Sequence, residues 1–259
     1  MEQVIAQVRE SIGGADKVRT TVIGLSLAAG VILAWLALHI YAVFFVDLAA
    51  INPLLVLALV AAQCWLYVGI FIVAHDCMHG SLAPGRPAVN RWFGRLCLFL
   101  YAAFDFDTLK AKHRDHHQHA GTEHDPDFHE DDPDSFWAWY VRFFREYFSG
   151  RELLIILAAV VAYVWLLGAS LANIWVFWAL PAIVSSLQLF YFGTYLPHQP
   201  GQEPFADRHN SRTNDYPHWL SLLTCFHFGY HHEHHLFPYL PWWRLPSAHD
   251  ALRRAEAGA

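Results

Sequence analysis

Charged side chains are scarce in this chain of 259 residues. Only 15% of the residues are charged and 55% are hydrophobic, whereas an ordinary globular domain carries about 25% charged residues. The formal net charge is −6 and no run of basic residues is present, which excludes a nucleic-acid partner. The composition therefore favours a membrane protein, and the length requires no more than one domain over residues 1–259.

Paired cysteines are also lacking. The four cysteines (Cys64, Cys77, Cys97 and Cys225) are scattered and form no CxxC pair. This spacing argues against a disulfide framework and against a thiolate metal site. No nucleotide or flavin fingerprint is present, nor a ligand set for haem or an iron–sulfur cluster. Any redox chemistry would therefore need electrons from a separate protein.

Lysine and arginine are absent from two long stretches, between Thr20 and Gly85 and between Glu152 and Asp207. Each stretch holds two apolar runs separated by a short turn. A helix that crosses the hydrocarbon core needs about 20 residues at 1.5 Å each. Each stretch therefore predicts a hairpin of two transmembrane helices. The expected spans are residues 22–46, 54–73, 153–171 and 174–192.

The distribution of cations predicts the orientation of these spans. Both turns lack lysine and arginine, and all 17 cationic residues lie on the opposite side. By the positive-inside tendency this side is cytoplasmic. The predicted fold is an all-α integral membrane protein with both termini and the segments 75–151 and 198–259 in the cytoplasm. A buried hairpin of a large soluble protein is the alternative.

Two further segments have the character of interfacial helices. Residues 1–13 place Val4, Ile5, Val8 and Ile12 on one helical stripe, which could lie on the membrane surface. Residues 91–106 are apolar but begin with two arginines, which predicts an interfacial or re-entrant helix.

Histidines gather in three short groups on the predicted cytoplasmic side. They are His75 and His79, then His113, His116 and His117, and finally His231, His234 and His235. Residues three and four apart share one face of a helix, so each group can direct its imidazoles at one point. Eight imidazoles exceed the needs of one ion, which predicts two ions. Imidazole suits iron, zinc, copper and nickel, so the ligand type does not choose the metal.

Isolated histidines have simpler interpretations. His39, His218 and His249 are expected to be polar residues near the membrane surface. His124, His129 and His209 are expected to be solvated or to support the ligands rather than to bind the metal.

At its histidine groups the sequence resembles the membrane fatty-acid desaturase and hydroxylase superfamily, whose signature is HxxxH, HxxHH and HxxHH. The run from His231 to Pro238 is similar to the third histidine box of many desaturases. Gly193-Thr-Tyr-Leu-Pro-His198 is similar to a segment that supplies one more metal ligand in that superfamily. The resemblance thus makes His198 the ninth ligand candidate. His227, four residues before His231, is its competitor.

Longer runs resemble the bacterial β-carotene ketolases within that superfamily, from about His75 to Pro246. The more specific segments are residues 75–82, 119–128, 192–198, 221–235 and 241–246. The resemblance implies a non-haem di-iron oxygenase that turns the C4 methylene of a β-ionone ring into a ketone. Two O2-dependent hydroxylations and a dehydration would convert β-carotene through echinenone to canthaxanthin, and zeaxanthin to astaxanthin.

The same resemblance implies a set of partners. Electrons are expected from reduced ferredoxin and its reductase, and the carotenoid is expected to enter from the bilayer of a bacterial inner membrane. Aromatic residues near the cytoplasmic ends of the spans could line its apolar channel, although an aromatic belt at the membrane interface is the simpler interpretation of any single one; they are Trp65, Tyr67, Phe71, Phe190, Tyr191, Phe192 and Tyr195. Carboxylates that could orient the imidazoles are Asp76, Asp115, Asp125, Asp127 and Glu233, with a solvated surface position as the alternative for Asp125 and Asp127.

Three other functions fit parts of the pattern. A lipid or fatty-acid desaturase or hydroxylase would use the same di-iron centre on another substrate. A membrane metal transporter would also concentrate histidines, but it predicts ionisable residues in the middle of its spans, and these are almost absent. A hydrolytic zinc enzyme needs only three protein ligands and an open position.

Overall fold

The computed structural model describes residues 2–12, 16–201 and 203–258, and within them every regular element is a helix. The prediction of an all-α fold is confirmed. The α-helices up to the middle of the chain are α1 (Glu2–Ser11), α2 (Lys17–Phe44), α3 (Pro53–His79), α4 (Pro87–Ala102), α5 (Phe106–His119), α6 (Phe136–Tyr147) and α7 (Gly150–Trp165). Those that follow are α8 (Leu171–Ile174), α9 (Leu180–Phe190), α10 (Leu196–His198), α11 (His218–Cys225), α12 (His231–Leu236) and α13 (Leu245–Ala257).

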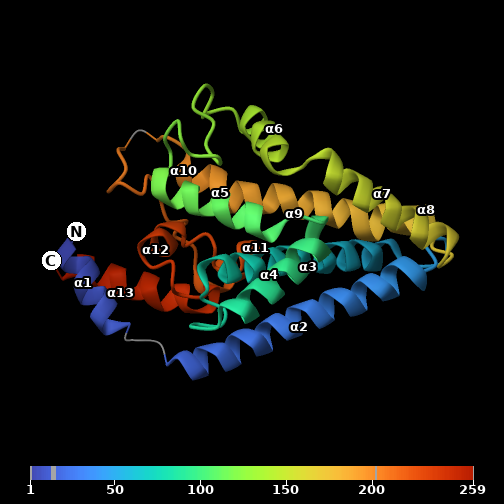
Figure 1. Cartoon of the computed structure of the whole chain (residues 1–259), viewed down its shortest axis with the longest axis horizontal. Helices are drawn as coiled ribbons and strands as arrows, with labels where there is room; N and C mark the ends of the chain where they lie inside the picture. The colour runs from blue at the N-terminus through green and yellow to red at the C-terminus, as the bar shows by residue number, and fades with distance from the viewer. Residues whose placement is uncertain (1, 13–15, 202, 259) are drawn as a thin grey trace.

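The long apolar helices α2 and α3 lie side by side along the length of the molecule (Figure 1). Asp16 begins α2 by accepting the backbone N–H groups of Val18 and Arg19. Asn52 does the same for Leu54 at the start of α3, where Pro53 already has the φ of a helix. Both helices are long and apolar enough to cross a membrane.

A third candidate span, Leu171–His198, is a composite helix. It joins α8, α9 and α10 through two π-helical turns, η1 (Trp175–Ala179) and η2 (Tyr191–Tyr195). Each π turn comes just before a proline, Pro181 and Pro197. A proline lacks a backbone N–H and its ring crowds the preceding turn, and a widened turn relieves both effects. The helix therefore continues past both prolines.

The expected continuous span at residues 153–171 is wrong. α7 ends at Trp165, and Gly168 has a φ of 71° that no right-handed helix contains. Instead, α6 and α7 have the length and composition of a span only when taken together, with a bend of 80° between them. Ser149 makes this break, because it caps α7 in a reciprocal capping box with Glu152. The described residues thus hold three candidate spans and one bent pair.

Both segments expected at the membrane surface differ from the prediction. The helix expected at 91–106 is divided, because α4 ends at Ala102, Ala103 follows in a left-handed conformation (φ 58°), and Phe106 opens α5. On α1, the stripe of Ile5, Val8 and Ile12 packs against α13 and the loop before it, so protein rather than lipid covers it. The side chain of Val4, which was expected on this stripe, lies outside the described residues.

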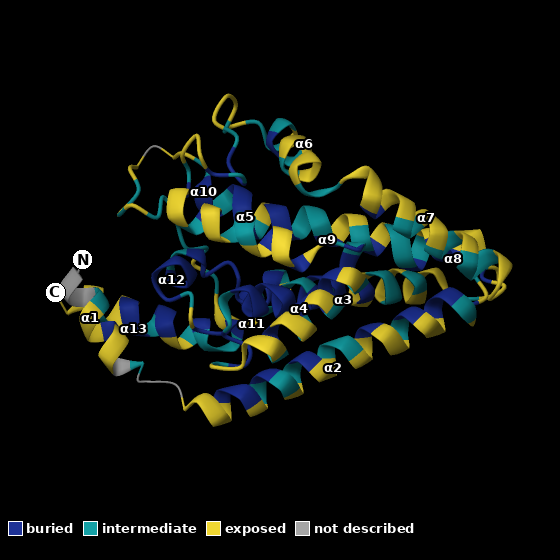
Figure 2. Cartoon of the chain, viewed as in Figure 1, coloured by how far each residue is buried: buried dark blue, intermediate teal, exposed yellow. Residues whose placement is uncertain are grey.

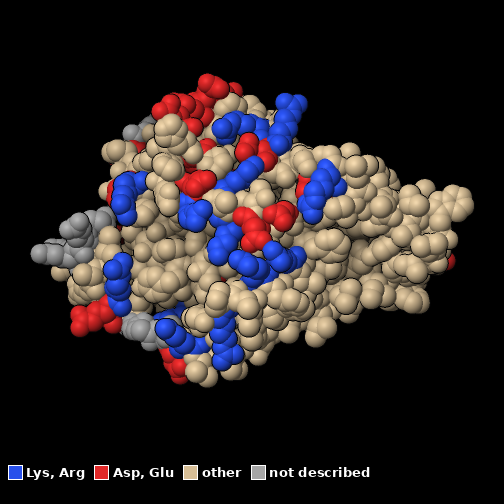
Figure 3. Space-filling view, in the orientation of Figure 1, with Lys and Arg blue, Asp and Glu red and all other residues tan. Residues whose placement is uncertain are grey.

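Charge and exposure divide the elongated molecule into two ends. The right-hand end in Figure 1 contains the turns at residues 45–52 and 166–170, and Figure 3 shows no lysine or arginine on its visible face. Exposed leucines cover the helices there, including Leu33, Leu57 and Leu154. The other end contains α1 and α13, and the lysines and arginines visible in Figure 3 lie there and toward the middle of the molecule. Figure 2 shows buried residues concentrated around α3, α11 and α12 at this charged end.

Gly94 provides a test of the packing between α4 and α5. A Cβ at Gly94 would lie 2.1 Å from Cε2 of Phe106, a ring that is buried. Gly94→Ala should therefore lower the melting temperature of the protein in detergent, at a cost of about 1–3 kcal/mol from overpacking. Gly30→Ala on α2 is the matched control, since no atom lies within 4 Å of its added methyl group. Equal melting temperatures for both variants would contradict this packing.

Candidate metal centre

Nine histidines meet in two clusters at the charged end of the molecule. In the first cluster, His75, His79, His113, His117 and His234 each place a ring nitrogen within 4.8 Å of the others. In the second, His116, His198, His231 and His235 do the same. These nine are the candidates obtained from the sequence and the resemblance. Helices α5 and α12 contribute to both clusters, whereas α3 serves only the first and α10 only the second.

Local structure places each group at the end of its helix. Gly80 stops α3 immediately after His79 with a φ of 72°. Asp105 caps α5 by accepting the N–H of Thr108, and the three histidines of α5 follow in its last two turns. Positive φ values at Phe226 and His227 turn the chain from α11 into α12, which carries the last group.

The ring nitrogens converge closely enough to share an ion. In the first cluster, Nε2 of His113 lies 2.7 Å from Nε2 of His79 and 3.2 Å from that of His117. In the second, Nε2 of His231 lies 2.9 Å from that of His198 and 3.1 Å from that of His235. Metal–nitrogen bonds are about 2.0–2.1 Å long, so ligand nitrogens on one ion stand about 3–4 Å apart. The donor sets therefore fit one metal ion in each cluster.

Burial keeps these imidazoles in the form that binds metals. It lowers the pKa of His113, His117 and His234 well below the ordinary value for histidine. The pKa values of His231 and His235 are lowered in the same way, with nearby histidines adding to the effect of burial. At neutral pH these rings are uncharged, and a neutral imidazole offers a lone pair to a metal.

His116 differs because it faces two carboxylates. Its Nδ1 lies 3.0 Å from Oδ1 of Asp125 and 3.7 Å from Oδ2 of Asp127. Burial alone would lower the pKa of His116, but the two carboxylates outweigh it and raise the pKa to about 9. Burial likewise raises the pKa of Asp125, yet the contact with His116 outweighs it and holds that pKa below its ordinary value. Without a metal His116 is therefore cationic at neutral pH, with its Nδ1–H held by Asp125. A metal ion in the second cluster would displace the proton on Nε2 and leave the Nδ1–H bonded to Asp125.

The other expected carboxylates do not bond to the clustered histidines as Asp125 does. Asp76 accepts the backbone N–H of Trp242 and lies 3.9 Å from Nδ1 of His75. Asp115 is exposed and makes no contact with the clusters. Glu233 sits between the ligand candidates of α12 but accepts from Thr213 and from Nδ1 of His249, the latter at 2.7 Å.

Two isolated histidines do not lie where the sequence suggested. His249 is buried and stacks on Tyr230 with ring centroids 4.3 Å apart, so it supports the segment carrying Glu233 rather than facing the membrane surface. His39 is buried inside α2 against Trp35 and Trp178. His218 is half-exposed, as expected of a surface histidine.

The choice between His198 and His227 has a clear geometric outcome. Nδ1 of His198 bonds to the carbonyl of Asn210 at 2.7 Å, which turns its Nε2 toward His231. His227 belongs to neither cluster and stacks on Trp242 instead. His198 is therefore the residue that completes the second cluster.

Comparison with known proteins supplies the family. The sequence model described as fatty acid desaturase matches residues 51–156 and 145–258. The chain belongs to the fatty acid desaturase family. It is 51% identical to a β-carotene ketolase of Paracoccus sp. strain N81106, over 89% of this chain and 94% of that one. A β-carotene ketolase of Paracoccus sp. strain PC1 is 49% identical over 91% and 96%.

Algal relatives of this desaturase-family chain are more distant and longer. It is 38% identical to a zeaxanthin 4-ketolase of Chlamydomonas reinhardtii, over 90% of this chain and 54% of the relative.

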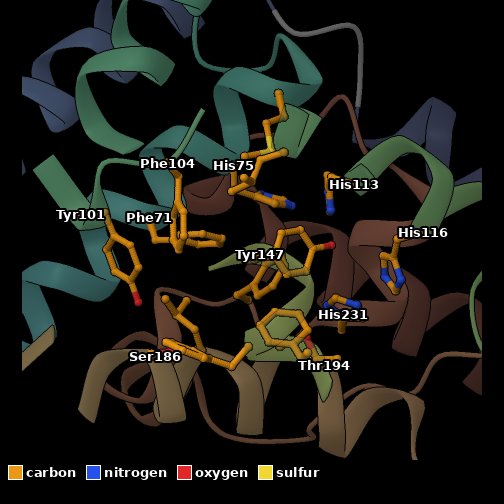
Figure 4. Close-up of a pocket in the computed structure, with 17 residues that line it drawn as sticks. Phe71, His75, Tyr101, Phe104, His113, His116, Tyr147, Ser186, Thr194 and His231 are labelled. Carbon is orange, nitrogen blue, oxygen red and sulfur yellow. The ribbon is translucent and has the colours of Figure 1, made fainter. Parts of the chain in front are cut away.

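An apolar cavity of about 90 Å³, the inner cavity, reaches the histidines of this desaturase-family protein, and its wall includes His75, His113, His116 and His231 (Figure 4). A second cavity of about 330 Å³, the outer cavity, lies between α4, α7 and α9. Tyr101, Phe104, Phe144 and Ser186 line both cavities, which are therefore neighbours along one path.

Most of the aromatic residues considered for this path lie elsewhere. Among the seven, only Phe71 lines either cavity. Tyr67 is buried in the core beside Trp35, and Trp65 stacks on Phe226. The aromatic wall comes instead from α4 and α6, which contribute Tyr101, Phe143 and Phe144 among others.

The metal content of two variants tests the second cluster. His198→Ala removes one of its four imidazoles, and the bound transition metal per chain should fall by about half if each cluster holds one ion. His227→Asn is the control, because asparagine tolerates the positive φ of 62° at that position. Elemental analysis of the two purified variants measures the bound metal per chain. Equal metal loss from the two variants would contradict the assignment of His198.

Proposed function

We propose that this chain is a non-haem di-iron oxygenase that converts the C4 methylene of a carotenoid β-ionone ring into a ketone. The observation that carries the proposal is the pair of histidine clusters at the wall of an apolar cavity. The named activities of the ketolase relatives, about half identical over nearly the whole chain, supply the substrate class. β-Carotene would give echinenone and then canthaxanthin, and zeaxanthin would give astaxanthin.

The proposed ligands are the nine clustered histidines, five for one iron and four for the other. Imidazole is a suitable ligand for iron, and membership of the desaturase family favours iron over the other metals that imidazole accepts. When bound, the two irons supply the activation of O2 and the removal of hydrogen from the substrate. Asp125 keeps one ligand, His116, in the tautomer and orientation that this role needs.

The cavity accounts for the choice of a hydrocarbon substrate. Apart from the histidines, its wall is mainly aromatic and aliphatic, so it binds an apolar ring and excludes water. Each hydroxylation consumes O2, two electrons and two protons and releases one water. A second hydroxylation of the same carbon gives a geminal diol, which loses water to leave the ketone.

Membrane placement follows from the helices and the charges. The proposed spans are α2, α3, the bent pair α6 and α7, and the composite helix from α8 to α10, with the charged end in the cytoplasm of a bacterial cell. The carotenoid would pass from the bilayer through the cavity between α4, α7 and α9. A reduced ferredoxin, supplied by its reductase, would bring electrons to the cytoplasmic face, whose cations attract an acidic protein.

The alternatives fit less well. A lipid desaturase or hydroxylase would share the metal centre, but it does not account for the high identity to ketolases over nearly the full length. A metal transporter should have a histidine path through the membrane. His39 is buried within a span, yet it belongs to neither histidine cluster and packs against Trp35 and Trp178.

Pigment analysis tests the proposed activity. In cells that make β-carotene and contain a working electron donor, the native chain should produce echinenone and canthaxanthin. His116→Ala should insert in the membrane but yield no keto-carotenoid, because the second cluster loses a ligand. Unchanged β-carotene with native protein present in the membrane would contradict a ketolase, and altered fatty acids in the same cells would identify the lipid alternative.

A further inference from the structure

Four hydroxyl groups belong to residues that line the inner cavity, and they lie at different distances from the histidines. Tyr101 and Ser186 lie on the side away from His113 and His116, and they also line the outer cavity (Figure 4). Tyr147 lies between these two sides with its hydroxyl directed toward the histidines. Thr194 lies on another wall, close to His231.

The ring of Tyr147 is fixed on both sides. It is the last residue of α6, and its hydroxyl donates a hydrogen bond to Oδ1 of Asp127. The ammonium group of Lys112 stands over its ring, 4.9 Å from the centroid. Asp127 in turn lies 3.7 Å from Nδ1 of His116, so the phenol is held in place relative to the second cluster.

This hydrogen bond decides what the phenol can offer to a bound molecule. A tyrosine hydroxyl has one proton to donate and lone pairs that accept. The proton of Tyr147 is already donated to Asp127. Toward the cavity the oxygen therefore acts as an acceptor, and it favours a ligand that carries an O–H group.

The forms of the reacting carbon differ in this one respect. A methylene group forms no hydrogen bond, an alcohol and the short-lived geminal diol each have a proton to donate, and a ketone accepts but has no proton to donate. An acceptor fixed beside the histidines therefore stabilises the alcohol and gives nothing to the hydrocarbon or to the ketone.

We propose that Tyr147 is a positioning residue that retains the 4-hydroxy carotenoid in the cavity between the first and second oxidations. The role rests on the proposed ketolase function. The alcohol donates to the Tyr147 oxygen and stays near the histidines, and the ketone, which cannot donate, leaves more readily. The same hydrogen bond thus favours completion of the reaction and release of its product.

Tyr147→Phe removes the hydroxyl and with it both the contact to the alcohol and the bond to Asp127, while the phenyl ring remains under Lys112 and as part of the cavity wall. Loss of the bond to Asp127 acts on the metal side and lowers total turnover, whereas loss of the contact to the alcohol changes the product ratio. In cells that make β-carotene, the ratio of 4-hydroxy to 4-keto carotenoid should rise about three- to tenfold, the factor expected for one neutral hydrogen bond.

Two control variants distinguish the hydroxyl of Tyr147 from other hydroxyl groups nearby. Tyr195→Phe removes a hydroxyl that donates to the carbonyl of Asp134 outside the cavity, so it should leave the product ratio unchanged. Thr194→Val removes the other hydroxyl at the histidine end, and a shift found there instead of in Tyr147→Phe would overturn the proposal.

A binding measurement without turnover provides the second readout. Purified protein without reductant is titrated with 4-hydroxy-β-carotene and with β-carotene, following the carotenoid absorption. Tyr147→Phe should weaken binding of the alcohol about three- to tenfold and leave that of β-carotene unchanged. Equal affinities for the alcohol in native and variant proteins, or an unchanged product ratio while ketone still forms, would overturn the role of Tyr147. Absence of ketone from the native chain would instead reject the ketolase function itself.

Discussion

The convergence of nine imidazoles at one place, six of them buried and three partly buried, is the constraint on which the rest of the structure depends. So many polar rings are costly to bury unless their nitrogens have partners, and a metal ion in each cluster would provide them. The arrangement requires the ends of α3, α5, α10 and α12 to meet, although they are far apart in the sequence. Because α5 and α12 each serve both clusters, movement of either helix would disturb both sites together.

In the proposed function, the apolar half of the molecule would present a hydrocarbon to this centre. The helices that carry exposed leucines extend away from the charged end. The outer cavity lies among these helices, and the inner cavity beside it reaches the histidines. Aromatic side chains of α4 and α6 would keep water from the reacting carbon. The few hydroxyl groups on this wall would therefore have a large influence, since apart from the histidines they are the only polar side-chain groups that line the inner cavity in the described part of the chain.

The sequence predicted what depends on local spacing and charge. Histidines at intervals of three and four identified eight of the clustered residues, the resemblance added His198, and the cation-free stretches located the apolar helices. It could not predict the interruptions of apolar runs that look continuous. Ser149 makes the bend before α7, Gly168 lies in the turn after α7, and the π turns come just before the prolines. Contacts across the fold were also beyond it: Tyr147 and Asp127 are 20 residues apart, and Glu233 meets His249 from another helix.

We propose that the two histidine clusters hold two iron ions, one each. Anomalous X-ray scattering at the iron absorption edge, measured on crystals of the purified protein, tests this most directly. Two iron peaks are expected, one among His75, His79, His113, His117 and His234 and one among His116, His198, His231 and His235. A single ion, or two peaks that follow the zinc edge and not the iron edge in active protein, would contradict it.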